Sequence, residues 1–240
     1  MSDLIRLDKF LSNQGIGSRS EVKKYIKNGK VTHHQLVIND PKYKVLTSDT
    51  EVSYNSRPAL FDEFVYIMLN KPKNVISATE DNYSKTVLDI IEHPLKKKMF
   101  PVGRLDKDTT GLLLITNDGN LAHNLLSPKK HVDKSYEVLV FGNVTEDTIH
   151  LFLKGVVLED GYKTMPSELK VIKSDDETTL VEITIKEGKF HQIKRMFSSV
   201  SMEVVELKRL SMGSVVLDEN LKEGDYRVLT DSELKSLVNR

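Results

Sequence analysis

The stretch FPVGRLDKDTTGLLLITNDG, residues 100–119, contains the most informative pattern of the chain: Asp106 and Asp108 stand beside Arg104 and directly precede the apolar run Leu112–Ile115. A short, fully apolar run is typical of a buried β-strand. Aspartates in loops are ordinarily turn formers or solvated. An ionised carboxylate near a low-dielectric wall, however, needs a cation or amide donors. If it is buried and paired, such a carboxylate can act as a base or a nucleophile.

Three further stretches stand out, and two of them have both a structural and a functional explanation. LNKPKNVIS (residues 69–77) is explained by an edge strand followed by a turn. KSYEVLV (residues 134–140) alternates, which makes Tyr136 either a half-buried packing residue or a platform on which a base stacks. EGKFHQIKRMF (residues 187–197) mixes basic and aromatic residues, which is typical of nucleic-acid contact, although a solvated helix face explains the charge equally well.

Composition excludes several classes of protein. The 240 residues contain no cysteine, so a disulfide framework, a thiolate nucleophile and a cysteine-bound metal are excluded, which fits a reducing cytosol. The first ten residues carry charges where a signal peptide needs an apolar core, and runs such as Phe64–Leu69 are too short to cross a bilayer. We therefore expect a cytoplasmic protein with no membrane partner.

No motif indicates a metal or a cofactor. The only adjacent histidines are His33 and His34, and no HExxH or Cys/His spacing is present. A Walker-type loop and a GxGxxG loop are also absent, so a nucleotide cofactor is not expected. The expectation is a protein that works with no cofactor and no metal.

The charges are unevenly distributed although the formal net charge is zero. Residues 1–60 hold 10 Lys+Arg and 6 Asp+Glu, a balance of +4, and the rest holds 25 and 29, a balance of −4. A polarised chain of this kind can carry a local basic patch for nucleic acid. Ordinary scatter of charges explains these counts equally well.

The first 30 residues predict two helices. The first ends near Gly15, and the second runs from about Arg19 to Asn28 after a capping box at Ser18–Glu21. On the second helix a spacing of four places Arg19, Lys23 and Lys27 on one stripe.

Short strands broken at residues 39–41 follow, and residues 51–55 alternate as one more strand. The polar, proline-containing segment 55–63 has no clear period and is the predicted linker. We expect one domain at residues 1–58 and a second at residues 59–240.

The second part combines β-branched segments with helices that do not alternate strictly, so an α+β fold with a mixed sheet is favoured over a doubly wound parallel one. The predicted helices lie at about residues 86–91, 119–126, 146–154, 191–198 and 231–238.

Together these motifs are more specific than each alone. GRLDKDTTGLLLITNDG resembles the catalytic motif of pseudouridine synthases, in the form found in the branch typified by the small-subunit ribosomal RNA enzyme RsuA and its large-subunit relatives. LNKPKNVIS and EGKFHQIKRMF resemble the first and third motifs of that branch, and LKRLSMG (residues 207–213) resembles its closing strand. RLDKFLSNQGIGSRSEVKKYIKNGKV resembles a small S4 (αL-type) RNA-binding domain. The resemblance implies a catalytic domain with a largely antiparallel central sheet flanked by helices.

The resemblance also implies roles for individual residues. Asp106 is the expected catalytic aspartate, Lys194 its cationic partner and Tyr136 the residue that packs against the target base. Arg104 is expected to hold the RNA open, and Ile193 to line the pocket. Further RNA contacts are expected from His191, Gln192, Arg195, Arg6, Arg19, Lys23 and Lys27. Relatives often have arginine at position 194, and lysine keeps the charge but not the two-pronged geometry. The S4 match departs at THHQLVIND (residues 32–40), where an Asn-Gly turn is common.

The implied chemistry agrees with these residue types. Conversion of uridine to pseudouridine breaks the C1′–N1 bond and forms a C1′–C5 bond without consuming electrons or water, so one carboxylate suffices and no cofactor is needed. The carboxylate must be ionised and shielded from water, and the base must be flipped out of its helix. Asp108 is interpreted as a turn residue or a supporting acceptor.

The expected substrate is a specific uridine of 16S ribosomal RNA, free or in a pre-ribosomal particle, and the expected enzyme is a monomeric pseudouridine synthase, an isomerase of ribosomal RNA modification. Three alternatives stay open: a synthase acting on 23S ribosomal RNA, a non-catalytic RNA-binding or assembly factor, and an N-glycosidase that releases free uracil. Glycosidases typically use two carboxylates, and here only Asp106 has a clear case.

Overall fold

The computed structural model describes residues 3–59 and 64–238. These residues form two compact units. The first contains the residues up to Val65 together with Glu92–Met99, and the second contains Tyr66–Ile91 and the residues from Phe100 onward. No helix within the described residues is long and apolar enough to cross a membrane.

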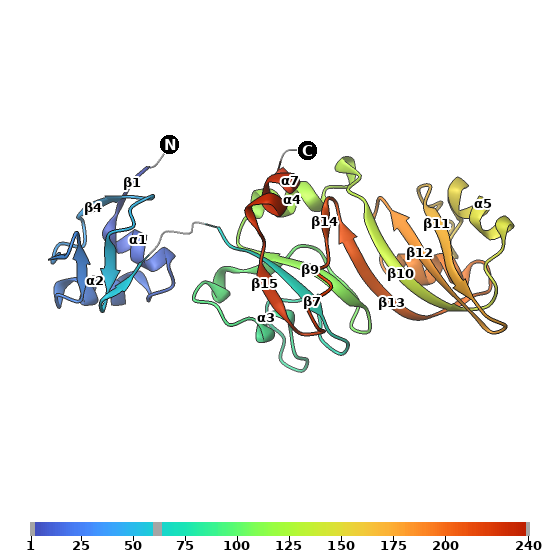
Figure 1. Ribbon diagram of the computed structural model, residues 1–240, viewed down its shortest axis with the longest axis horizontal. Coiled ribbons are helices and arrows are strands. Elements are labelled where there is room, and N and C mark those ends of the chain that lie inside the picture. Colours follow the sequence, from blue (N-terminus) through green and yellow to red (C-terminus); the bar gives the residue numbers. More distant parts are fainter. Residues whose placement is uncertain (1–2, 60–63, 239–240) are drawn as a thin grey trace. The chain divides into compact units, whose positions relative to one another are not determined.

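The first unit packs two helices against short strands (Figure 1). Its elements are β1 (Leu4–Arg6), α1 (Leu7–Asn13), α2 (Arg19–Lys27), β2 (Val31–His33), β3 (Leu36–Val37), β4 (Lys44–Leu46), β5 (Val52–Tyr54) and β6 (Arg57–Pro58). Strand β1 pairs with β4, and the other four form a sheet in the order β3-β2-β5-β6. Ala59 is buried in the hydrophobic core of this unit, one residue beyond the boundary expected at residue 58. Of the predicted linker, residues 60–63 lie outside the described residues.

Helix α2 begins as the sequence predicts. The Ser18 hydroxyl accepts from the amide of Glu21, whose carboxylate accepts from the amide of Ser18. This reciprocal pair satisfies two amides that the first turn of a helix leaves without partners. Val22 and Ile26 on the same helix are fully buried, so its orientation is set by packing on one face and the other faces stay polar.

The second unit is built on a nine-stranded mixed sheet within the described residues, in the order β11-β12-β10-β13-β9-β7-β15, with β14 paired to β13 and β8 paired to β9. Seven of its strand pairs are antiparallel, and one, between β13 and β9, is parallel. Helices flank the sheet, as Figure 1 shows for α4, α5 and α7. The predicted α+β fold with a mixed, largely antiparallel sheet is confirmed.

The elements of the second unit have these bounds. They are β7 (Tyr66–Lys71), α3 (Val87–Ile90), β8 (Phe100–Pro101), β9 (Thr110–Thr116), α4 (Gly119–Leu126), β10 (Lys134–Phe141), α5 (Glu146–Lys154), β11 (Glu168–Ser174), β12 (Thr178–Ile185), α6 (Gln192–Ser198), β13 (Glu203–Met212), β14 (Val215–Val216), β15 (Tyr226–Val228) and α7 (Asp231–Val238). Two 3₁₀ turns lie at Lys96–Lys98 in the first unit and Pro128–Lys130 in the second.

Two strands show why the sequence pattern leads to this sheet. Every residue of β9 is buried, as expected of an apolar run inside a sheet. In β10 buried and half-buried residues alternate along KSYEVLV, because successive side chains point to opposite faces. Strand β7 differs from the expectation of an edge strand. It lies between β9 and β15, and Lys71 at its end is completely buried.

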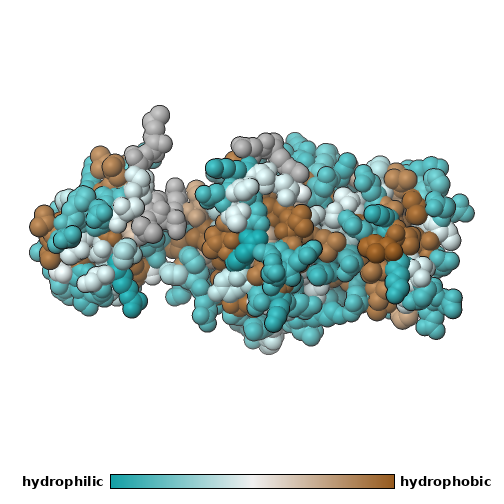
Figure 2. All heavy atoms as spheres, viewed as in Figure 1, coloured by the Kyte–Doolittle hydropathy of each residue, from teal (hydrophilic) through white to brown (hydrophobic). Residues whose placement is uncertain are grey.

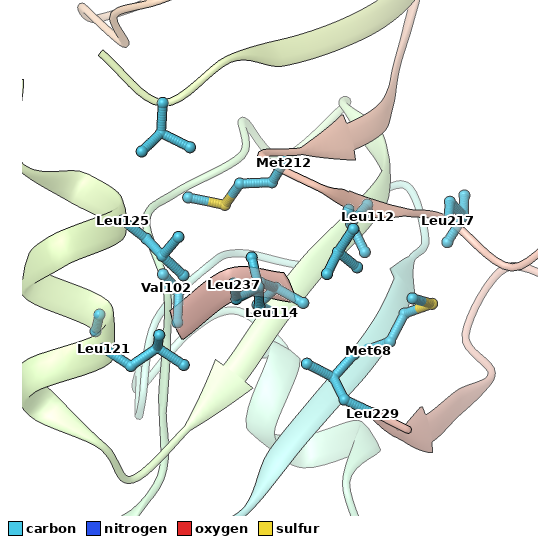
Figure 3. Close-up of a cluster of buried hydrophobic side chains, with 13 residues drawn as sticks. Met68, Val102, Leu112, Leu114, Leu121, Leu125, Met212, Leu217, Leu229 and Leu237 are labelled. Atoms are coloured by element: carbon cyan, nitrogen blue, oxygen red, sulfur yellow. The ribbon is translucent and has the colours of Figure 1, made fainter. Parts of the chain in front are cut away.

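The hydrophobic core that supports this part of the sheet is drawn in Figure 3. Leu121 and Leu125 of α4 lie on one side, Leu112 and Leu114 of β9 lie near the middle, and Met212 comes from β13. Leu237 of α7 belongs to the same cluster. In the space-filling view of Figure 2, hydrophilic residues cover most of the face shown, with hydrophobic patches over the second unit. The core therefore fastens β9, whose first residue follows the acidic loop.

Candidate active site

The acidic loop lies between β8 and β9 and is a tight turn. The amide of Thr109 donates to the carbonyl of Asp106 at 3.1 Å, the i to i+3 bond of a β-turn. Asp108 is the third residue of this turn and is exposed, whereas Thr109 is buried where the chain enters β9. The interpretation of Asp108 as a turn residue agrees with this geometry.

The segment that follows β7 holds this loop in place. The Lys71 ammonium donates to the carbonyls of Thr109, Pro72 and Lys107 at 2.8, 3.1 and 3.4 Å. The amide of Asn74 also donates to the Lys107 carbonyl, at 2.8 Å. Burial lowers the pKa of Lys71 to about 8, against the attraction of Asp108 and Asp106.

A side-chain hydroxyl fixes the start of the same loop. Ser77 Oγ donates to the carbonyl of Leu105 at 2.9 Å, and the amide of Leu105 lies 2.9 Å from the same Oγ. The LNKPKNVIS stretch therefore holds the acidic loop in place through hydrogen bonds to the loop backbone, which connects the two sequence motifs in space.

Helix α6 and the residue before it bring Lys194 and His191 to the aspartates. The Lys194 ammonium lies 3.9 Å from Asp106 Oδ2, but only 2.6 and 2.7 Å from the two carboxylate oxygens of Asp108. His191 Nε2 lies 3.6 Å from Asp106 Oδ1. Burial works to raise the pKa of Asp108, but the hydrogen bonds and charge of Lys194 hold it below its usual value. In this state the closest partner of Lys194 is Asp108, not Asp106.

The site is also more open than the sequence predicts. The side chains of Asp106 and Lys194 keep 30% and 27% of their surface exposed, so neither is sealed from solvent. A cavity of about 80 Å³ beside them is lined by Arg104, Asp106, Tyr136, Ile193 and Lys194, among others. Tyr136, from β10, and Ile193 are buried walls of this cavity, whereas Arg104 is exposed at its edge.

Two residues expected at the RNA are engaged inside the protein. Gln192 is buried, and its side chain accepts from the amide of Lys189 and donates to Glu187, both at 2.8 Å. It therefore shapes the loop before α6. Arg195 forms ion pairs with Glu159 and Asp160 at 3.0 and 2.5 Å. By contrast, His191 stacks on the exposed ring of Phe190 at the rim, with ring centroids 3.8 Å apart.

In the first unit the expected RNA-binding cations fall into two kinds. Arg6 and Arg19 both pair with the buried carboxylate of Asp8, at 2.7 and 3.3 Å. These pairs compensate the buried charge of Asp8, while the side chains of Arg6 and Arg19 stay 37% and 51% exposed. Lys23 and Lys27 are exposed on α2, as is Arg19, and within the described residues neither lysine forms an ion pair.

Several residues of the site were not expected from the sequence. They are Lys71 and the pair Lys134 and Arg209, which are buried beside Tyr136. The bond from Lys194 to Asp108 was not expected either. The one usable signal was at Lys134. A lysine two residues before Tyr136 occupies the same face of an alternating strand, and that face is otherwise apolar.

The comparisons with known proteins agree with this geometry. Residues 65–199, more than half of the chain, match the family model described as RNA pseudouridylate synthase, and residues 5–50 match the S4 domain. The chain belongs to the pseudouridine synthase family. It is an isomerase acting on RNA and carries an S4 RNA-binding domain.

Relatives that match over nearly the full length of the chain indicate which type of pseudouridine synthase it is. A Bacillus subtilis protein named "Uncharacterized RNA pseudouridine synthase YtzG" is 48% identical over 97% of this chain and 98% of its own length. The Escherichia coli K12 protein named "Ribosomal small subunit pseudouridine synthase A" is 39% identical over 98% of this chain and 100% of its own. A solved structure described as a pseudouridylate synthase matches with TM-score 0.68 and 36% identity, covering 97% and 99% of the two chains. The protein is thus a pseudouridine synthase of the RsuA type, and the predicted family is confirmed.

Proposed function

We propose that this protein converts one uridine of 16S ribosomal RNA into pseudouridine, with Asp106 as the essential catalytic group. The similarity to the E. coli small-subunit enzyme supports the choice of RNA. The observation that carries the proposal is the carboxylate of Asp106, which lies 3.9 Å from the Lys194 ammonium and 3.6 Å from a ring nitrogen of His191, beside the buried ring of Tyr136 in one cavity.

The proposed reaction takes place on a base that has left its helix. An extruded uridine enters between Tyr136 and Ile193, and the exposed Arg104 at the edge of the cavity holds the RNA open. The half-exposed Asp106 becomes enclosed when RNA covers the site, and exclusion of water protects the detached base from hydrolysis. Asp106 then acts as nucleophile or as the acceptor of a sugar proton, and no cofactor is required by this chemistry.

The proposed partner is ribosomal RNA, free or in a pre-ribosomal particle, and the proposed working form is a cytoplasmic monomer. Residues 1–58 serve as the RNA-binding domain and residues 59–240 as the catalytic domain, consistent with the ranges that match the two family models. Lys23 and Lys27 supply contacts to phosphates, because both are exposed on one helix stripe.

The Asp106→Asn variant tests the catalytic assignment. It keeps the shape of the side chain and removes the charge, so pseudouridine formation is expected to fall at least ~1,000-fold while RNA binding changes little. Asp176→Asn, at an exposed position outside the site, is the matched control. Wild-type activity of Asp106→Asn would refute the assignment.

The substrate is tested by mapping pseudouridines in ribosomal RNA from cells that lack the protein. One missing pseudouridine in 16S RNA, restored by the wild-type gene and not by Asp106→Asn, is the expected result. A missing site in 23S RNA would redirect the proposal to the large subunit. Unchanged RNA would identify a non-catalytic factor, and mass spectrometry showing released uracil would identify a glycosidase.

A further inference from the structure

A second cavity adjoins the catalytic one in the same unit and carries two buried cations. It measures about 480 Å³, and Lys134 and Arg209 both line it. Arg104, Tyr136, Gly188 and Lys189 line this cavity and the catalytic cavity alike. The two cavities therefore share part of their wall, and Tyr136 belongs to the shared part.

Strand pairing places both cations next to Tyr136. Arg209 lies directly opposite Tyr136 in the pairing of β10 with β13. Lys134 lies two residues before Tyr136 on β10, so the side chains of both point to the same face. The spacing along the strand is about 6.7 Å, which is within the span of one nucleotide.

Among the described residues the two cations have no acidic partner. Lys134 is 9% exposed and donates to the carbonyl of Val132 at 2.8 Å, and Arg209 is 2% exposed and donates to the carbonyl of Leu112 at 2.6 Å. Neither forms an ion pair with a carboxylate of the described residues. The Arg209 Nη2 atom is buried and has no hydrogen-bond partner among these residues.

Uncompensated burial of two like charges is unfavourable. Burial, and then the charge of Arg209, lower the pKa of Lys134 to about 8, and the opposing effect of Asp133 is smaller. Another acid in the cavity wall, Glu187, is already occupied. Its oxygens accept from Tyr162, Met165 and Gln192. The unmet charge in this cavity is positive.

We propose that Lys134 and Arg209 form a binding site for a phosphodiester group of the substrate strand, next to the nucleotide whose base packs on Tyr136. An arginine with an unused N–H and a lysine ammonium are the groups that bind phosphate oxygens through charge-assisted hydrogen bonds. The site would position the sugar of that nucleotide relative to Asp106. This inference rests on the proposed function, because it assumes that the flipped nucleotide occupies the catalytic cavity.

Binding of small probes tests the site without catalysis. Uridine, uridine 3′-monophosphate and uridine 5′-monophosphate are titrated into the full-length protein and followed by NMR. We expect one monophosphate to bind at least 10-fold tighter than uridine, and the preferred isomer identifies the flanking phosphate. Lys134→Met and Arg209→Gln should abolish this preference, whereas Lys170→Met, at an exposed position on β11, should keep it. Equal binding of all three probes to the wild type would overturn the proposal.

Single-turnover kinetics on the RNA substrate test the role in catalysis. We expect Lys134→Met and Arg209→Gln each to slow pseudouridine formation at saturating RNA at least 10-fold, and Arg209→Lys to lose less than Arg209→Gln. Melting temperatures separate this role from a structural one, because removing an uncompensated buried cation should leave the temperature unchanged or raise it. A lower melting temperature together with an unchanged preference for the monophosphate would overturn the proposal. An inactive wild type that still prefers a monophosphate would count against the proposed function and not against the phosphate site.

Discussion

Lys194 lies near two carboxylates that are two residues apart in the sequence, those of Asp106 and Asp108. Its ammonium binds Asp108 at 2.6 Å and lies 3.9 Å from Asp106. Asp108 holds the third position of a turn that starts at Asp106, so the backbone of one acid is fixed relative to that of the other. We interpret Asp108 as a positioning residue that keeps Lys194 beside Asp106, the proposed catalytic aspartate, when no RNA is bound.

The Asp108→Ala variant tests this interpretation. Without its closest partner Lys194 gains freedom, so we expect the single-turnover rate to fall about 10-fold, far less than for Asp106→Asn, because orientation and not the reacting group is lost. RNA affinity should change little. A rate equal to that of the wild type would show that Asp108 only forms the turn.

Lys71 is a buried lysine whose ammonium group donates hydrogen bonds to backbone carbonyls of the acidic loop. Its folded-state pKa is about 8, whereas an unperturbed lysine titrates near ~10.4. Between these values the unfolded chain binds more protons than the folded one, so the free energy of unfolding rises with pH through this window.

The Lys71→Met variant lacks this titration. We therefore expect the stability of the wild type, measured relative to Lys71→Met by urea denaturation, to increase by about 2–3 kcal/mol from pH 8 to 10.5. Lys170→Met serves as the control and should follow the wild type. A difference that stays constant over this range would mean that Lys71 titrates normally. Activity of Lys71→Met should also fall, because three loop carbonyls lose their donor.

At the scale of elements, one glycine allows strands β9 and β13 to lie close enough to pair. Gly111 at the start of β9 has a positive φ of 96°, and a Cβ there would lie 2.3 Å from the carbonyl oxygen of Arg209. Only glycine fits this backbone angle and this contact. The parallel pairing of β9 with β13 depends on it, because Gly111 is the residue that pairs with Arg209. On its other side β13 pairs with β10, where Arg209 lies opposite Tyr136.

The C-terminal helix α7 is fastened by an ion-pair network. Arg227 of β15 donates to both carboxylate oxygens of Glu233 at 2.8 and 2.9 Å, and to Asp218 at 2.7 Å. The carboxylate of Glu233 also accepts from the amide of Thr230, which closes the start of the helix. The bonds to Arg227, ahead of those to Thr230, lower the pKa of Glu233 to about 2 despite its burial.

The Glu233→Gln variant is expected to be less stable than the wild type by about 1–2 kcal/mol at neutral pH, a value discounted for partial exposure. The stabilisation by Glu233 is fully present above its unfolded pKa near ~4.3 and is lost as the pH falls toward 2. The difference between the two proteins should therefore shrink over that acidic range. Glu219→Gln, at an exposed position, should show no such trend. A gap independent of pH would contradict the assignment.

At the scale of the whole molecule, we propose that one unit binds RNA and the other performs the chemistry. The first unit matches the S4 domain, and the positive balance of the chain lies in residues 1–60. The residues that we propose to be catalytic lie in the second unit. Zero net charge is thus compatible with RNA binding, because the field near a surface depends on the local distribution of charge.

Salt dependence of RNA binding tests this division. Each phosphate contact that is lost should reduce the slope of log K against log salt by about 0.7–0.9. We expect Lys23→Gln combined with Lys27→Gln to lower the slope by between one and two in all RNAs tested, with the catalytic rate at saturation unchanged. Lys170→Gln is the control outside the first unit. An unchanged slope would show that these lysines do not meet the RNA.

Elements with strong local patterns were predicted well. Helices α4, α5 and α7 begin and end at the predicted residues, because each has an apolar stripe and two begin after an Asp or Thr N-cap. Short strands such as β1 and β15 were missed, since three residues carry no detectable period. The prediction that β7 is an edge strand was wrong, because the strand that covers its other side, β15, lies far along the chain.

The sequence by itself determined the family, the fold class and the identity of the acidic loop, because these are carried by contiguous motifs and by apolar periodicity. The tertiary structure alone decided that Lys194 binds Asp108, that Lys71 holds the loop, and that Lys134 and Arg209 face one cavity. These relations join residues that are tens of positions apart, and they depend on strand register and on distances of a few ångströms. Local sequence patterns do not encode such quantities, because they arise only when the whole sheet is assembled.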